Sequence, residues 1–366
     1  MSVEQRAPEY IRSISPYIPG KPTSELAREM GLSESTIVKL ASNENPLGMS
    51  PKARAAMQSM LDSLALYPDG NGFGLKQALA RKYGVGMDAI VLGNGSNDTL
   101  ELAARAFLPT GTSAVYSRHA FAVYSLAVQC MGARGIEVPA RAWGHDLAAM
   151  ADAIAPDTRI VFLANPNTPP GSFVPSHLLE AFLARVPENV LVLLDEAYNE
   201  YLPPELRYDS VAWIKRFPNL VISRTFSKIY GLAGLRVGYA VANPAVADLM
   251  NRVRAPFNVN SLALVAAEAA LDDDEFLQKS YEMNRAGMTQ IIEGLDALNL
   301  EHIPSVANFV TFRVGDGAGV NRRLLQQGVI VRPIANYGMP EWLRVTIGLE
   351  AENVRFLEAL DKALKG

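Results

Sequence analysis

Between residues 41 and about 256 the sequence alternates short apolar runs with stretches of helical periodicity. The apolar runs lie at residues 89–92, 113–116, 159–163, 190–194 and 220–222 and contain few polar residues. Strands that are apolar on both faces need cover on both sides, and intervening helices supply it. The pattern therefore predicts an α/β domain with a mostly parallel, helix-flanked sheet. The run at 237–242 follows its predecessor without a helix between them, which favours an antiparallel strand there.

Beyond residue 256 the pattern changes to a long helical tract at 262–298, separate strands at 309–312, 329–331 and 342–347, and a closing helix at 351–364. This order is typical of a smaller α+β domain. A chain of 366 residues is long enough for two domains. We therefore expect an N-terminal arm at residues 1–40, a large cofactor-binding α/β domain at 41–256 and a small α+β domain at 257–366.

Composition narrows the class of protein. The formal net charge is −4, and lysine and arginine do not cluster, so a nucleic-acid partner is not expected. No apolar stretch has the roughly 18 residues of a membrane span, and the start of the chain lacks a signal core, which favours the cytoplasm. The single cysteine, Cys130, permits no internal disulfide and is predicted to be buried. Four histidines without ligand spacing indicate no metal site.

Polar residues follow several predicted strands, at the edge of an α/β sheet where ligands bind. The strand at 220–222 leads into Thr225, Ser227 and Lys228, and Arg236 follows a glycine-containing turn. Hydroxyls and a guanidinium can hold a phosphate while the lysine amine reacts with an aldehyde. Ser-Lys alone would also fit a solvated strand end.

Two further loops also carry groups that could bind an anionic ligand. The amides of Gly95, Ser96 and Asn97 open a helix and could face an anion, although tight turns with a polar cap look similar. Asn165 lies in a proline-rich loop that could hold a ligand oxygen or could be only a rigid turn.

Asp195 ends the apolar strand at 190–194, and Tyr198 follows three residues later. A carboxylate there is costly to bury without a cationic partner, and a protonated pyridine nitrogen would serve. Tyr198 could then reach the phenolic oxygen of the same ring. The alternative is that Asp195 caps the next helix. Taken in order along the chain, these residues supply the contacts that pyridoxal phosphate requires.

The sequence resembles the fold type I pyridoxal-phosphate aminotransferases and, among them, the histidinol-phosphate aminotransferases. The resemblance is carried, in the expected order, by residues 40–48, 67–70, 93–96, 165–168, 195–198, 223–228, 234–238 and 343–348. It implies that Lys228 binds the cofactor covalently and moves the substrate proton, and that Asp195 pairs with the ring nitrogen. The resemblance also implies contacts from Asn165 and Tyr198 to the ring oxygen. The phosphate would be held by Gly95, Ser96, Asn97, Thr225, Ser227 and Arg236.

For the substrate, the resemblance implies that Arg344 binds an anionic group, assisted by Arg332, Tyr17 and Tyr67. A buried salt bridge is the alternative for Arg344. Tyr67 lies on a loop that in this family enters the partner subunit's site, so a homodimer with shared active sites is expected. Phe121 occupies the position of the tyrosine that usually stacks on the cofactor ring.

The expected reaction is transamination of L-histidinol phosphate with 2-oxoglutarate, giving imidazole acetol phosphate and L-glutamate in histidine biosynthesis. Phe121 and the phosphate loop depart from the family pattern, which leaves an aromatic amino acid (phenylalanine or tyrosine) aminotransferase as the alternative. A decarboxylase or a carbon–sulfur lyase would use the same scaffold. A cofactor-sensing regulator lacks its basic helix pair here, and a nicotinamide dehydrogenase lacks its glycine fingerprint.

Overall fold

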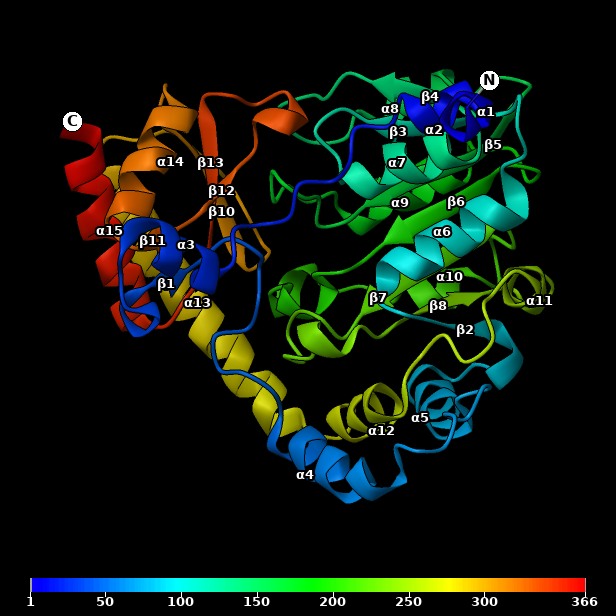
Figure 1. Cartoon of the computed structure of the whole chain (residues 1–366). Coiled ribbons are helices and arrows are strands. Elements are labelled where there is room, and N and C mark those ends of the chain that lie inside the picture. Colours follow the sequence, from blue (N-terminus) through cyan, green and yellow to red (C-terminus); the bar gives the residue numbers. More distant parts are fainter. Residues whose placement is uncertain (1, 366) are drawn as a thin grey trace.

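A seven-stranded mixed sheet forms the centre of the larger part of the computed structural model, which describes residues 2–365 (Figure 1). The strand order is β2-β8-β7-β6-β5-β3-β4. Strands β7, β6, β5, β3 and β4 run parallel, whereas β8 is antiparallel to both of its neighbours. The predicted α/β fold and the antiparallel strand are confirmed. The bounds are β2 (Ile90–Gly93), β3 (Ser113–Ser117), β4 (Arg134–Val138), β5 (Thr158–Ala164), β6 (Leu191–Asp195), β7 (Leu220–Thr225) and β8 (Gly238–Ala242).

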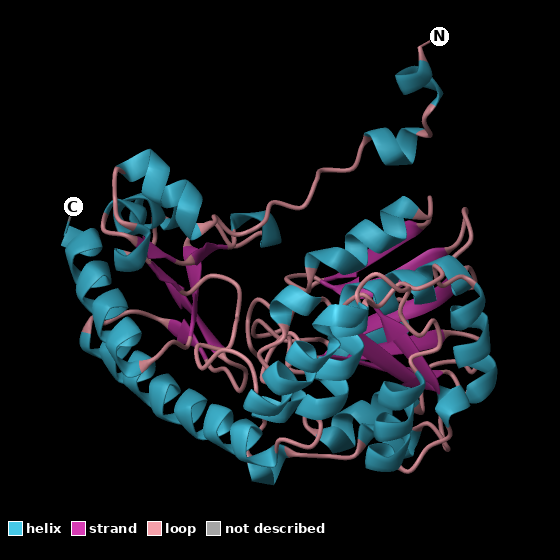
Figure 2. Ribbon diagram, turned by 60° about the horizontal axis from the view of Figure 1, so that its bottom comes forward, coloured by secondary structure: helices cyan, strands magenta, loops and turns pink. Residues whose placement is uncertain are grey.

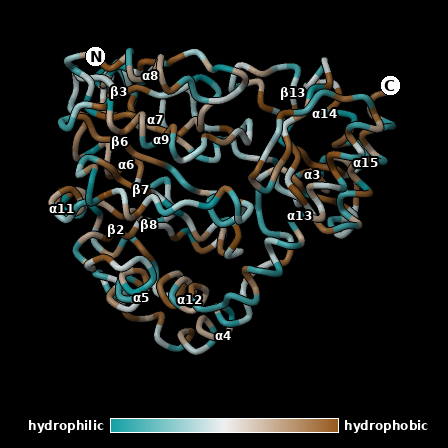
Figure 3. Tube along the Cα trace, turned by 180° about the vertical axis from the view of Figure 1, so that it is seen from behind, coloured by the Kyte–Doolittle hydropathy of each residue, from teal (hydrophilic) through white to brown (hydrophobic). Residues whose placement is uncertain are grey.

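Helices cover both faces of this sheet, as its continuous apolar strands require. Strand β5 sends Ile160 and Phe162 into one hydrophobic cluster and Val161 and Leu163 into another on the opposite face. In Figure 3 hydrophobic stretches follow the central strands. The helices that pack into the first cluster are α6 (Ser96–Phe107), α7 (Ala122–Cys130) and α11 (Pro244–Arg252); α8 (Leu147–Asp152), α9 (Ser176–Leu183) and α10 (Ser210–Trp213) pack into the second.

The smaller part contains a four-stranded antiparallel sheet in the order β12-β13-β10-β9. Its strands are β9 (His302–Ile303), β10 (Phe309–Arg313), β12 (Arg332–Pro333) and β13 (Trp342–Thr346). Helices α13 (Asp274–Ala297), α14 (Gly317–Gln326) and α15 (Glu350–Lys365) share one core with this sheet. Strand β1 (Val38–Lys39) pairs in parallel with β11 (Val329–Ile330), and α3 (Thr23–Met30) packs Leu26 beside Ile330. The residues before position 41 thus contribute to the smaller part.

Helix α12 (Ser261–Ala270) packs with the large sheet, although the sequence places a domain boundary near residue 256. It contacts α4 (Pro51–Met60) and α5 (Phe73–Tyr83) within the cluster that contains Leu92. Its apolar residues, mostly alanines, do not reveal which body they join. Helix α13, 24 residues long, then connects the two parts.

The N-terminal arm crosses from one part to the other. Its short helices α1 (Val3–Arg6) and α2 (Glu9–Arg12) precede an extended segment that leads to α3 (Figure 2). Ser13 accepts a hydrogen bond from Gln129 of α7 at 3.1 Å, so the arm begins against the large domain and ends against the small one. Among the described residues no helix is long and apolar enough to span a bilayer.

The prediction that Cys130 is buried is wrong, because its thiol side chain is exposed. Helix α7 buries Tyr124, Ala127 and Val128 at helical spacing, and Cys130 falls outside that stripe.

Candidate active site

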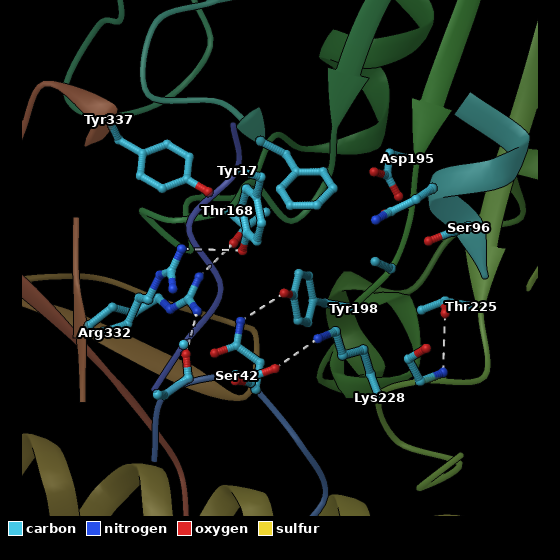
Figure 4. A pocket seen from close by; sticks show the side chains of 18 of the residues that line it. Tyr17, Ser42, Ser96, Thr168, Asp195, Tyr198, Thr225, Lys228, Arg332 and Tyr337 are labelled. Atoms are coloured by element: carbon cyan, nitrogen blue, oxygen red, sulfur yellow. Dashed lines mark hydrogen bonds between the residues drawn. The ribbon is translucent and has the colours of Figure 1, made fainter. Parts of the chain in front are cut away.

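A cavity of about 180 Å³ lies where the strand ends of the large sheet meet the arm and the small domain (Figure 4). Most of the residues predicted from the sequence line it. They are Tyr17, Ser96, Asn97, Phe121, Asp195, Tyr198, Thr225, Ser227, Lys228, Arg236, Arg332 and Arg344.

Asp195 is a buried acid with one free oxygen. It ends β6, and its Oδ2 accepts a hydrogen bond from the Tyr124 hydroxyl at 2.8 Å. Oδ1 has no hydrogen-bond partner among the described residues. Burial raises the pKa of this carboxyl to about 6, although the Tyr124 hydrogen bond opposes the rise. A positively charged donor placed at Oδ1 would stabilise the ionised form.

An anion cradle lies at the N-terminus of α6. The first helical residues are Ser96 and Asn97, and Arg236 donates to Ser227 Oγ at 3.1 Å beside them. Gly95 has a φ of +85°, and a Cβ atom there would collide with the Arg236 guanidinium. Helix dipole, free amides and a guanidinium together favour a phosphate at this point.

Lys228 lies between this cradle and the small domain. Its Nζ donates to the carbonyl oxygen of Ser42 at 3.1 Å and lies 5.6 Å from the centre of the Tyr198 ring. The Tyr198 hydroxyl accepts a hydrogen bond from Asn43 at 2.8 Å. Sequence reasoning gave Ser42 and Asn43 no role, although both fall within the motif at residues 40–48 that supports the resemblance. A positive φ of 56° at Asn43 is a conformation that asparagine tolerates well.

Arg344 and Arg332 face the cavity from the small domain. Arg344, on β13, donates to Thr168 Oγ1 at 3.2 Å and to the carbonyl oxygen of Ala41 at 3.0 Å, and its Nε is unpaired. Burial lowers the pKa of this guanidinium. Arg332 donates to the Tyr17 hydroxyl at 3.2 Å and to the carbonyl oxygen of Ile18 at 2.8 Å. All these acceptors are neutral, so the salt bridge considered for Arg344 is not found among residues 2–365.

Three predicted residues lie outside the cavity lining: Gly95, which precedes the cradle residues Ser96 and Asn97, and Asn165 and Tyr67. The Asn165 side chain accepts from the Val174 amide at 2.8 Å and donates to the Val174 carbonyl and the Tyr208 hydroxyl, which braces its own loop. Thr168, from the same loop, lines the cavity instead. Tyr67 is 82% exposed and stacks on Phe257 with ring centres 4.8 Å apart.

Comparison with known proteins assigns the family. The sequence profile of "Aminotransferase class I and II" matches residues 35–360. The chain is 63% identical to histidinol-phosphate aminotransferase 1 of Dechloromonas aromatica over 364 residues, which cover all of both chains. It is 62% identical to histidinol-phosphate aminotransferase 2 of Nitrosospira multiformis, covering all of this chain and 93% of that relative. The chain belongs to the histidinol-phosphate aminotransferase family.

Among solved structures, this aminotransferase resembles the histidinol-phosphate aminotransferase of Sinorhizobium meliloti in complex with pyridoxal-5'-phosphate. The TM-score is 0.90 at 28% identity, over 98% of each chain. The cofactor of the family is pyridoxal 5'-phosphate, and the cavity fits it. Asp195 offers a buried, unpaired oxygen to a ring nitrogen, α6 offers a phosphate cradle, and Lys228 offers an amine between them.

Proposed function

We propose that the chain transfers the amine of L-histidinol phosphate to 2-oxoglutarate, forming imidazole acetol phosphate and L-glutamate for histidine biosynthesis in the cytoplasm. The observation that carries this proposal is the pair Arg332 and Arg344, which line the same cavity as Lys228 and bind only neutral oxygens there. Two guanidiniums without a carboxylate partner suit a phosphate dianion. The carboxylate of 2-oxoglutarate can use the same arginines in the second half of a ping-pong cycle.

Bound pyridoxal phosphate supplies an aldehyde that accepts the amine and a ring that withdraws electrons. In our proposal the Lys228 amine would hold the cofactor through its aldehyde and would move the proton at the substrate α-carbon. Asp195 Oδ1 would accept a hydrogen bond from the protonated ring nitrogen and keep it protonated, Tyr198 would donate to the ring oxygen, and Phe121 would cover the ring face. Asn165 acts by bracing the loop that presents Thr168. The phosphate contacts come from Gly95, Ser96, Asn97, Thr225, Ser227 and Arg236.

The donor substrate is tested by single-turnover kinetics on the purified holoenzyme. L-Histidinol phosphate should convert the bound cofactor faster than L-phenylalanine or L-tyrosine does. A much faster reaction with phenylalanine would instead identify an aromatic amino acid aminotransferase. Release of carbon dioxide or pyruvate would indicate a decarboxylase or a lyase.

A homodimer with shared sites is the second part of the proposal. Tyr67 does not line the cavity of its own chain, and it follows the exposed apolar residues Leu61, Leu64 and Leu66. Exposed apolar surface of this kind supports contact with a second copy, whose cavity Tyr67 would then enter.

Mixing two impaired variants tests the sharing. Lys228→Ala and Tyr67→Ala dimers, exchanged with each other, should form hybrids in which one of two sites is intact, so activity should rise above that of either variant. A mixture that stays at the average of its components would contradict shared sites.

A further inference from the structure

Tyr337 is a cavity residue that no sequence motif singles out. It ends the short helix η7 (Ala335–Tyr337) between the two strands that carry Arg332 and Arg344. Its ring is buried against Ile334, Met339 and Trp342, yet it lines the active-site cavity. In Figure 4 its hydroxyl points into the group of cavity residues, in the direction of Tyr17 and Thr168.

The Tyr337 hydroxyl lies in the field of both substrate-side arginines. Burial raises the pKa of this phenol and the neighbouring Tyr17 raises it further, whereas Arg344 and Arg332 lower it. The amide of Ala122, at the start of α7, also faces this group and lowers its pKa. Among residues 2–365 the side-chain hydrogen bond found at Tyr337 is made by its backbone carbonyl and not by its hydroxyl. The hydroxyl oxygens of Tyr17 and Tyr198 each accept a side-chain hydrogen bond, from Arg332 and from Asn43 respectively.

The backbone of Tyr337 is held from the large domain. His119 Nδ1 donates to its carbonyl oxygen at 2.5 Å. The Trp143 ring centre lies 5.5 Å from that of His119 and 4.9 Å from that of Trp342. Because Trp342 begins β13, these aromatic contacts link His119 to the strand that carries Arg344. The hydroxyl is therefore presented from a fixed position rather than from a free loop.

We propose that Tyr337 determines specificity for the phosphorylated donor by donating a hydrogen bond to a phosphate oxygen that a carboxylate cannot present. This inference rests on the proposed function. In L-histidinol phosphate a methylene and an ester oxygen separate the phosphorus from the amine-bearing carbon, whereas an amino acid attaches its carboxylate directly. The phosphoryl group thus extends further from Lys228 and carries three terminal oxygens. Arg332 and Arg344 can each take one oxygen, and Tyr337 takes the third.

The Tyr337→Phe variant tests this, because it keeps the buried ring and removes only the hydroxyl. The kcat/KM for L-histidinol phosphate should fall roughly 10- to 100-fold, mainly through KM, as expected for one hydrogen bond to a charged group. The half-reaction with 2-oxoglutarate and the cofactor content should stay within about twofold of wild type. Inorganic phosphate should also become a weaker competitive inhibitor of the 2-oxoglutarate half-reaction. Tyr281→Phe removes a hydroxyl from α13 outside the cavity and should change nothing.

Equal losses with the phosphorylated donor and with 2-oxoglutarate would assign Tyr337 a structural role and overturn the proposal, as would unchanged kinetics with both. His119→Asn should shift the same ratio of specificities in the same direction but less, because it loosens the anchor and keeps the hydroxyl. Failure of the proposed function would look different from failure of this inference, because the wild-type enzyme would then not react with L-histidinol phosphate. Competition by inorganic phosphate would still show whether the Tyr337 hydroxyl binds a phosphate.

Discussion

The cofactor side of the cavity and its substrate side differ in how the chain assembles them. The groups that we propose for the cofactor stand at the ends of adjacent strands β6 and β7 and at the start of helix α6, which packs on the same sheet. The groups that we propose for the substrate come from the arm, from β12 and from β13, and Arg332 contacts Tyr17 across 315 positions of sequence. One side is thus built within a single domain, and the other depends on how two domains and an arm come together.

The hydrogen bonds differ in the same way. On the cofactor side, side chains bond to side chains, as Tyr124 does to Asp195 and Arg236 to Ser227. On the substrate side each arginine donates one hydrogen bond to a side-chain hydroxyl and one to a backbone carbonyl, Arg344 to that of Ala41 and Arg332 to that of Ile18. Because each arginine depends on the placement of another segment, changes there should alter substrate binding while leaving the cofactor in place.

The Lys228→Ala variant should give the largest effect on turnover, because it removes the reactive group on the cofactor side of the cavity. Loss of the amine that binds the aldehyde and moves the α-proton should lower turnover by about 10³-fold or more. The phosphate cradle and Asp195 remain, so part of the cofactor should stay bound without a covalent link. Turnover and the cofactor retained after desalting are the measurements. Full activity would contradict the role given to Lys228.

The Arg344→Lys variant should weaken substrate binding without changing cofactor binding. Lysine keeps the charge but loses the fork that reaches both Thr168 and the Ala41 carbonyl, so the KM for both substrates should rise roughly 10- to 100-fold. Cofactor content and its visible absorbance should match wild type. A variant that purified without cofactor would show that the two sides are not separable.

The Asp195→Asn variant tests the cofactor side through the way the free energy of unfolding depends on pH. Burial raises the pKa of Asp195 to about 6 in the folded, cofactor-free chain, above the usual value of 3.8. Between these values the folded state keeps a proton that the unfolded state releases, so the free energy of unfolding falls as pH rises through this window. The full loss is about 3 kcal/mol at the upper limit.

Because asparagine does not ionise, the cofactor-free variant should melt at a higher temperature than wild type at pH 7.5, and the gap should narrow toward pH 4. Burial also lowers the pKa of His145 to about 4, but this histidine titrates alike in both proteins and cancels in the difference. Wild type melting at the higher temperature throughout this range would refute the expectation.

The same contrast explains what the sequence could predict. Strands β5, β6 and β7 are apolar on both faces, so their ends, with Asp195 and Thr225, could be placed from the sequence alone. The edge strand β4 is not evident from the sequence, because Arg134 and Glu137 interrupt its apolar pattern. Strands of two residues, such as β1 and β9, are too short to give a period.

Within the site, residues on loops are the ones that the sequence could not place. Asn165 and Thr168 lie in one proline-rich loop, and no periodicity says which of them faces the cavity. Tyr337 lies between Arg332 and Arg344 without a local signal, and only the contact between the domains brings its hydroxyl to the pocket.

The smallest predicted effect concerns a turn of the large domain whose Trp143 packs against Trp342 of the small domain. Arg141 and Gly144 exchange backbone hydrogen bonds around Ala142 and Trp143, whose φ values of 47° and 62° are both positive. Such a turn favours asparagine or glycine over alanine, so Ala142→Asn should stabilise the protein by about 0.5 kcal/mol. Thermal denaturation should show a small rise in melting temperature with unchanged kinetics, because Trp143 still packs on Trp342. Ala148→Asn, on the exposed face of α8, is the matched control and should lower stability slightly, since asparagine is the poorer helix former. A fall in stability for both variants would mean that the turn does not strain Ala142.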